Sequence, residues 1–354
     1  MYMPHLTMPG SSIFIFSREP DFNRIANNEV AVVQRCCTIQ QQRFLRVAAN
    51  FGMKLIYDLD DNVWDLPAYN PAAPIIAKYK EGFYACMLEV DAVTVSTPTL
   101  AKIVQKVLAK SVNRRTGKKI PVIVAENRIL PKLFAPAAQP ATSKVRIGWA
   151  GSASHVGDLP LVQDAVLQFG NQENVEIEFR GIDLPPNNPV RQLPNYRFKH
   201  WVPVAEYPAR MPAWRWNIAL APITNHEFNA SKSSIKMIEA GYCGIPCLAS
   251  WVRPYEEFCQ HIPELKWLLC SGAAAFKSKL RDLVNDAALR GYYGGLMWRV
   301  VEEHYSLDQR RHEGWEEAFD TLRINPVDAS EDIQTDMLIE GMDKLRLCPG
   351  TGGL

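Results

Sequence analysis

The sequence predicts an α/β protein with two tandem, doubly wound Rossmann-like domains that face each other across an interdomain cleft. Short, continuously apolar segments alternate with amphipathic ones, which is typical of parallel strands covered by helices on both faces. The 354 residues correspond to two domains at about 150 residues each. A Pro- and Ala-rich stretch at residues 131–140 divides the chain, and its composition is typical of an exposed linker.

In the first half, five apolar runs predict strands: Ile13–Phe16, Val30–Val33, Lys54–Tyr57, Ala92–Val95 and Pro121–Ala125. Amphipathic stretches at Gln40–Asn50 and Thr99–Ala109 predict helices that cover this sheet. We therefore place a first domain at residues 1–135.

In the second half, four apolar runs predict strands: Val145–Trp149, Val175–Phe179, Asn217–Pro222 and Pro246–Ser250. Leu159–Phe169 and Ser233–Tyr242 are the matching amphipathic stretches. The second domain is placed at residues 143–324. The tail at 325–354 has weak periodicity and receives no assignment.

Composition excludes several protein classes. Hydrophobic residues make up 47% and charged residues 22%, which argues against a disordered chain, a collagen and a coiled coil. No apolar run approaches the roughly 18 residues that span a bilayer, and residues 1–10 do not resemble a secretory signal. The eight cysteines include no CxxC pair, which favours reduced thiols over a zinc site. We expect a cytoplasmic protein, with peripheral contact to an anionic membrane as an open alternative.

The most informative segment is a polar helix start followed by a short amphipathic helix and a Gly-Ile-Pro turn. Asn229 or Ser231 can cap the helix, and Lys232 and Lys236 lie near its beginning. A helix start with free N–H groups and nearby lysines is an anion site suited to a diphosphate. Glu239, on the same face as Lys236, can accept hydrogen bonds from ribose hydroxyls. The alternative is an ordinary helix with surface Lys/Glu pairs.

A second candidate is the small-residue turn after the strand that begins the second domain. Gly151 and Ser152 allow a phosphate or a sugar to approach the backbone closely. The turn is neither GxGxxG nor a Walker loop, which weakens the dinucleotide and P-loop interpretations. His155 is either a ligand contact or a cap, and Asp158 is expected to cap the next helix.

A third candidate is a set of carboxylates at the end of the strand Lys54–Tyr57: Asp58, Asp60, Asp61 and Asp65. In α/β folds, ligand-binding groups follow the carboxyl ends of strands. These acids could bind Mg²⁺, act in acid/base chemistry or bind sugar hydroxyls. Turn and capping chemistry is the structural alternative. A ligand held between the halves would touch both this cluster and the anion site.

Charge is unevenly distributed although the whole chain carries only +1. Residues 1–142 hold 17 Lys and Arg against 11 Asp and Glu, whereas residues 143–354 hold 22 against 27. The basic stretch Lys102–Lys119 is either a solvated helix end and loop or a surface for an anionic acceptor or lipid.

Five motifs occur in a familiar order: Tyr57–Asn62, Asp91–Pro98, Glu126–Asn127, Gly148–Ser152 and Lys232–Pro246. Together they resemble retaining, nucleotide-sugar-dependent glycosyltransferases with the GT-B fold. The resemblance is to the group often called family four, which includes O-antigen-type and phage-encoded members. The ordered matches extend over roughly residues 30–320.

This resemblance implies transfer of a sugar from a nucleoside diphosphate to a hydroxyl acceptor, with retention of configuration. It places Glu239 on the ribose and Trp201–Val202 at the base. It places Lys232, Ser233, Lys236 and the Gly151–Ser152 loop at the diphosphate. Asp60 and Asp61 would face the sugar, and the catalytic set would be Asp60, Asp61, His155, Lys232 and Lys236. No cofactor is implied, and lysines replace an essential metal.

The acceptor expected from the resemblance is a glycan or a lipid-linked glycan. A hydroxylated base of phage DNA is a second acceptor, and a nucleotide-sugar 2-epimerase or a non-catalytic sugar-nucleotide-binding protein are rival functions. The sequence departs from the family in two places. Ser231 stands where a Glu often lies eight residues before the ribose Glu, with Glu227 or Asn229 as substitutes. No Gly-rich loop follows Ile13–Phe16.

Overall fold

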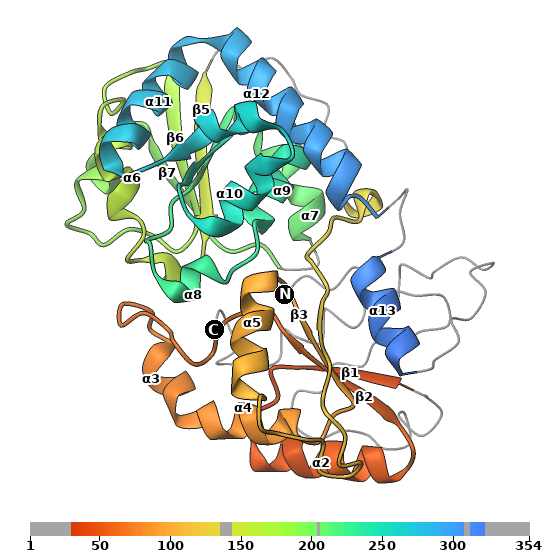
Figure 1. Ribbon diagram of the computed structural model, residues 1–354. Coiled ribbons are helices and arrows are strands. Elements are labelled where there is room, and N and C mark those ends of the chain that lie inside the picture. The colour runs from red at the N-terminus through yellow and green to blue at the C-terminus, as the bar shows by residue number, and fades with distance from the viewer. Residues whose placement is uncertain (1–29, 135–143, 204–205, 308–311, 323–354) are drawn as a thin grey trace.

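The structure is a computed structural model that describes residues 30–134, 144–203, 206–307 and 312–322. It has two lobes, each built around a parallel sheet (Figure 1). The predicted strand Ile13–Phe16, the tail 325–354 and most of the predicted linker lie outside the described residues. The described start of that linker, Pro131–Leu133, is a single 3₁₀ turn.

In the described part of the first sheet, four strands lie in sequence order: β1 (Val30–Gln34), β2 (Lys54–Leu59), β3 (Ala92–Val95) and β4 (Val122–Val124). All three strand pairs are parallel. The helices between them are α2 (Ile39–Asn50), α3 (Ala73–Ile76), α4 (Lys80–Met87) and α5 (Pro98–Val107). The four strands predicted between residues 30 and 125 are therefore confirmed.

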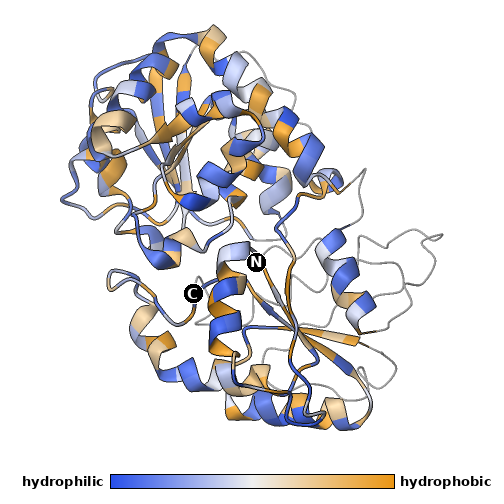
Figure 2. Cartoon of the chain, viewed as in Figure 1, coloured by the Kyte–Doolittle hydropathy of each residue, from blue (hydrophilic) through white to orange (hydrophobic). Residues whose placement is uncertain are grey.

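Local sequence explains where two of these helices begin. Thr38 and Gln41 form a reciprocal capping box that starts α2. Thr97 caps α5 and is followed by Pro98 at the first helical position. Apolar residues on the inner faces of these helices pack against the strands of the first sheet. Figure 2 shows hydrophobic residues in the strands of both lobes.

The second sheet has six parallel strands in the order β10-β9-β8-β5-β6-β7. They are β5 (Val145–Gly151), β6 (Val175–Gly181), β7 (Tyr196–Lys199), β8 (Ile218–Ala221), β9 (Cys247–Ser250) and β10 (Leu269–Cys270). The strand order reverses between β5 and β8, which is the switch point where doubly wound sheets bind ligands. The predicted α/β fold with two Rossmann-like domains is confirmed.

Helices cover both faces of the second sheet: α6 (Pro160–Leu167), α7 (Tyr207–Arg210), α8 (Glu227–Ala230), α9 (Ile235–Tyr242), α10 (Arg253–Gln260), α11 (Ala273–Asn285) and α12 (Ala287–Val300). A π-helical turn, Val301–Tyr305, follows α12. Among the described residues, none of the helices has both the length and the apolar character needed to cross a membrane.

The last described helix, α13 (Glu313–Thr321), returns to the first sheet. Its Trp315 is 2% exposed and packs in a cluster with Ile56 of β2 and Ile123 of β4. Gly314 lies so close to β4 that an added Cβ would be 2.1 Å from the Val124 carbonyl oxygen. The predicted end of the second domain at residue 324 therefore differs from the structure, because α13 completes the core of the first domain.

Candidate active site

A cleft between the domains contains a cavity of about 220 Å³. Groups at or after the carboxyl ends of β1 to β4 meet the beginning of α9 there, and the lining residues are Gln34, Asp58, Asp60, Ser96, Ala125, Asn127, Ile235 and Glu239. Both domains thus contribute polar side chains to one enclosed space. This is the position that parallel α/β sheets provide for a ligand.

Asp58 is buried within β2 at the floor of this cavity. Its carboxylate accepts hydrogen bonds from Gln34 Nε2 at 2.8 Å and Thr94 Oγ1 at 2.8 Å. Burial, together with the charge of Asp60, raises the pKa of Asp58 to about 6. Gln34 Oε1 is buried and has no hydrogen-bond partner within the described chain, so the floor keeps one free acceptor.

An ion network joins the loop after β2 to the second domain. Arg35 Nε lies 2.5 Å from Asp60 Oδ1, and Arg35 Nη2 lies 2.9 Å from Asp61 Oδ2. Asp61 Oδ1 is also 3.2 Å from Lys232 Nζ, across the cleft. Burial raises the pKa of Asp61, but Lys232 and Arg35 outweigh it, so the net pKa is lowered. The structure therefore brings Asp60, Asp61 and Lys232 together.

Arg35 is a member of this network that the sequence analysis missed. It follows β1 directly and has a φ of 51°, a left-handed conformation that is uncommon outside glycine. Its backbone N–H donates to the Asp58 carbonyl at 3.3 Å. The available signal was its position, because it follows a predicted strand just as Asp60 and Asp61 do.

Lys236 and Glu239 lie on α9, one turn apart. Lys236 Nζ donates to the Ala150 carbonyl and lies 5.7 Å from the centre of the Trp149 ring. Burial lowers the pKa of Lys236. Glu239 is 7% exposed and accepts a hydrogen bond from the Tyr207 hydroxyl at 3.0 Å. Burial raises the pKa of Glu239 to about 7, although the charge of Lys236 opposes this.

The predicted caps of this helix were wrong. A separate short helix, α8, precedes α9, so Asn229 and Ser231 lie too early to cap it. The Ser231 hydroxyl donates to the Phe228 carbonyl, and the Asn229 amide donates to the Thr224 carbonyl. Ser234 precedes α9 without a side-chain capping bond. The start of α9 is therefore left without a side-chain cap, as an anion site requires.

Ser231 also has a role between the domains. It is fully buried, and its carbonyl accepts a 2.8 Å hydrogen bond from Thr97 Oγ1 of the first domain. Ser233 Oγ accepts a 2.7 Å bond from Asn127 Nδ2. Of the two substitutes considered for the missing glutamate, Asn229 is engaged and buried, whereas Glu227 is exposed at the start of α8.

The turn after β5 is compact. Ser152 Oγ and Ser154 Oγ are 2.6 Å apart. Gly151 pairs with Gly181 of β6, and an added Cβ at Gly181 would lie 2.3 Å from the Gly151 carbonyl oxygen. Trp201, after β7, is 57% exposed beside Gly181, and Val202 packs on the core. The predicted base-binding residues thus lie next to this turn.

His155 pairs with the buried Asp158, with Nδ1 of His155 2.9 Å from Asp158 Oδ2. Burial lowers the pKa of His155 to about 4, so the ring is neutral near pH 7. An ionised carboxylate only accepts hydrogen bonds, so Nδ1 carries the proton and Nε2 is an acceptor. Asp158 is not the predicted helix cap, because it accepts bonds from Thr224 N at 2.7 Å and the Tyr69 hydroxyl at 3.0 Å.

The carboxylate cluster is smaller than predicted. Asp58 is held inside the sheet, and Asp65 is exposed. Asp60 and Asp61 are both paired with Arg35, and Asp61 with Lys232. Both acids that were expected at the cleft therefore face cations of the protein itself.

No known protein family matches the chain, and no curated protein matches it by sequence. Several solved structures share its fold. Sucrose-phosphate synthase from Thermosynechococcus elongatus has a TM-score of 0.59 at 16% identity, covering 85% of this chain and 76% of its own. Anabaena HepE in complex with UDP and glucose has a TM-score of 0.56 at 12% identity. The match covers 84% of this chain and 80% of HepE. The pneumococcal O-GlcNAc transferase GtfA in complex with UDP and GlcNAc has a TM-score of 0.55 at 12% identity. The match covers 86% of this chain and 59% of GtfA. At these identities, the similarity shows that this chain has the GT-B fold.

Proposed function

We propose that this protein is a glycosyltransferase that moves a sugar from a nucleoside diphosphate to a hydroxyl of a glycan or lipid-linked glycan, with retention of configuration. The observation that carries the proposal is the beginning of α9. An uncapped helix start, Lys232, Lys236 and the buried Glu239 lie together in the cleft. This combination provides cations for a diphosphate and a carboxylate for ribose hydroxyls.

In this proposal, the diphosphate takes the place of the Asp61 carboxylate on Lys232 and of the Ala150 carbonyl on Lys236. The free N–H groups of α9 and the turn at Gly151 and Ser152 complete its binding site. Negative charge grows on the diphosphate as the glycosidic bond breaks. Fixed cations in a partly buried site stabilise that charge without reorganising. We propose that no metal is essential, so activity should persist in EDTA.

The sugar would lie between the turn after β5 and the first domain. His155 offers Nε2 as an acceptor for a sugar hydroxyl, while Asp60 and Asp61 approach from the opposite wall. Glu239 accepts from the ribose, and the exposed indole of Trp201 offers an aromatic face for the base. The acceptor would enter on the side of the first domain, whose cavity wall contains Asp58, Ser96 and Asn127.

The structures of HepE and GtfA were determined with UDP bound, which supports a nucleotide-sugar donor for this chain.

The test is a transfer assay with a panel of labelled nucleotide sugars, in buffer with EDTA. The acceptors offered are pooled lipid-linked and soluble glycans and, separately, hydroxymethylated DNA. We expect label in a glycan with one donor, and loss of transfer in Lys236→Met. Conversion of the donor sugar to its 2-epimer without acceptor would indicate the epimerase instead. Label in hydroxymethylated DNA alone would replace the glycan acceptor, and donor binding without turnover would leave a binding protein.

A further inference from the structure

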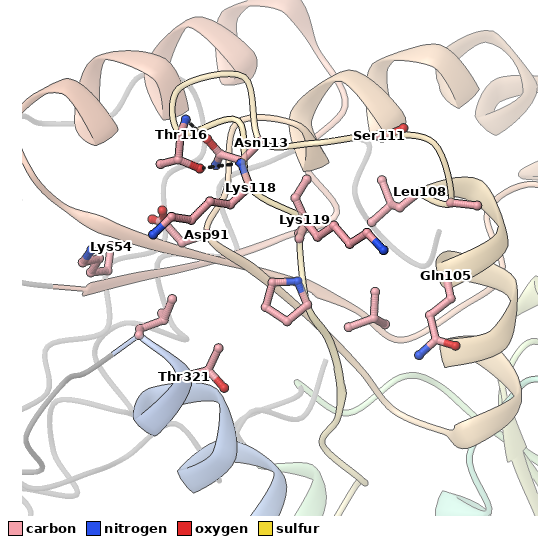
Figure 3. A pocket seen from close by; sticks show the side chains of 15 residues that line it. Lys54, Asp91, Gln105, Leu108, Ser111, Asn113, Thr116, Lys118, Lys119 and Thr321 are labelled. Atoms are coloured by element: carbon pink, nitrogen blue, oxygen red, sulfur yellow. Dashed lines mark hydrogen bonds between the residues drawn. The ribbon is translucent and has the colours of Figure 1, made fainter.

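A second cavity, of about 850 Å³, lies in the first domain (Figure 3). Its walls include the beginning of β2 at Lys54, Asp91 just before β3, and the beginning of β4 at Val122. The candidate active site lies at the opposite, carboxyl ends of these strands. The cavity is therefore separate from the cleft, and nothing in the proposed transfer reaction uses it.

The charge that the described residues bring to this cavity is positive. Lys54, Lys118 and Lys119 line it, and none of them pairs with a carboxylate in the described part of the chain. Among the described residues of the lining, the single acid is Asp91, and both of its oxygens are engaged. Oδ1 lies 2.8 Å from Arg115 Nη2, and Oδ2 accepts from Leu55 N at 3.0 Å.

The loop that carries two of these lysines has a fixed frame. Asn113 is 2% exposed, and its Oδ1 accepts from Arg115 N at 2.9 Å and Thr116 N at 2.8 Å. Its Nδ2 donates to the Val90 carbonyl at 2.7 Å, and its N–H donates to the Lys118 carbonyl at 2.8 Å. The backbone positions of the lysines are thus set before any ligand arrives, which lowers the entropic cost of binding.

The remaining surface of the cavity is mixed. Leu108, Ile120 and Leu322 are buried residues that supply an apolar wall. Gln105 and Ser111 add neutral polar groups. Figure 3 shows Lys54 and Lys118 at one end near Asp91, whereas Lys119 extends toward Gln105 and Leu108. Apolar area with a few placed polar groups, in a volume between roughly 300 and 1,000 Å³, is typical of small-molecule sites.

We propose that this cavity binds an organic phosphate, with the phosphate on Lys54 and Lys118 and the organic group beside Lys119, against Leu108, Ile120 and Leu322. Lysine binds phosphate as a point charge with three donors, and two lysines can neutralise a dianion. The same chemistry could come from a soluble phosphate ester or from the headgroup of a phosphatidic acid. The proposal does not rest on glycosyl transfer.

The test uses phenyl phosphate in calorimetry with the full-length protein. The pocket variant is Lys54→Gln/Lys118→Gln/Lys119→Gln. The matched control, Lys78→Gln/Lys266→Gln/Lys277→Gln, removes the same charge from exposed sites elsewhere. We expect the control to bind like the parent and the pocket variant to bind at least tenfold more weakly, with unchanged melting temperatures. Inorganic phosphate should bind the parent more weakly than phenyl phosphate, because it leaves the apolar wall uncovered.

A second arm separates the two sources and the two sites. Sedimentation with phosphatidylcholine vesicles that contain phosphatidic acid tests the headgroup. The parent and the control variant should bind these vesicles, and the pocket variant should not. Lys232→Gln should keep the phenyl phosphate affinity, because that lysine lies in the cleft, and UDP binding should be the same in the pocket variant and the parent. Equal binding of both probes by pocket and control variants, or no binding of either probe by the parent, would overturn the proposal.

Discussion

At the scale of single residues, the cleft contains ionisable groups whose pKa values are shifted from the ordinary ones by burial. Burial raises the pKa of Glu239 to about 7 and that of Asp58 to about 6, and it lowers the pKa of His155 to about 4. Residue types and spacing could predict that Glu239, Lys232 and Asp61 would share a site. They could not predict Arg35, because its role depends on the left-handed backbone after β1, which brings its guanidinium to both acids.

The raised pKa of Glu239 makes stability depend on pH. The folded-state pKa is about 7, above the ordinary 4.5, so the neutral carboxyl stabilises the fold. That contribution is fully present below pH 4.5 and is lost as the pH rises through 7. Relative to Glu239→Gln, the free energy of unfolding of the parent should fall by about 3 kcal/mol between pH 4.5 and 8. Urea unfolding at several pH values measures this, and parallel curves for the two proteins would contradict it.

In the proposed function, Asp61 competes with the diphosphate for Lys232, with which it pairs in the structure. Asp61→Asn should therefore raise the affinity for a nucleoside diphosphate about two- to fivefold, which is the scale of a partly exposed ion pair. Calorimetric titration with UDP, GDP and ADP measures the effect. Asp65→Asn is the control, because Asp65 lies on the same loop but is exposed. Weaker binding by Asp61→Asn would show that Asp61 holds Lys232 in place for the ligand rather than competing with it.

At the scale of elements, hydrophobic patterns predicted the described strands well, because parallel strands covered on both faces are continuously apolar. β7 was missed because Arg197 and Lys199 interrupt its pattern at the edge of the sheet, and β10 is too short for a pattern. The caps of α9 were misassigned because residues 227–230 form their own turn. Composition alone does not separate one helix from two.

Close contact between β5 and β6 positions the turn at Gly151. Gly181 has a φ of 97°, and an added Cβ would overlap the Gly151 carbonyl. Gly181→Ala should lower the free energy of unfolding by about 1–3 kcal/mol through overpacking and backbone strain. Gly295→Ala, at an open and exposed position inside α12, should instead raise it by about 1 kcal/mol. Chemical denaturation compares the two variants, and equal effects would refute this packing account.

At the scale of the whole molecule, the chain crosses between its domains more often than the sequence indicates. An amphipathic pattern shows that a helix has a buried face but not which sheet covers it. This is why α13 was assigned to the second domain. The cleft also depends on cross-domain bonds, such as Thr97 to Ser231 and Asn127 to Ser233, whose partners no sequence pattern connects.

The return of α13 predicts a long-range effect. Trp315→Ala should destabilise the first domain by about 3–5 kcal/mol, because it empties a buried site beside β2 and β4. Hydrogen exchange should then show lost protection in β3 and β4, while β5 and β6 stay protected. Uniform loss in both sheets, or none in β3, would mean that α13 does not complete the first core.

The central claim is that the cleft binds a nucleoside diphosphate at the beginning of α9. Calorimetric titration of UDP, GDP, ADP, CDP and dTDP into the parent, Lys236→Met and Lys78→Met tests it most directly. We predict that one diphosphate binds the parent and Lys78→Met equally, and binds Lys236→Met at least tenfold more weakly. Equal affinity of all three proteins, or no binding of any diphosphate to the parent, would contradict the account.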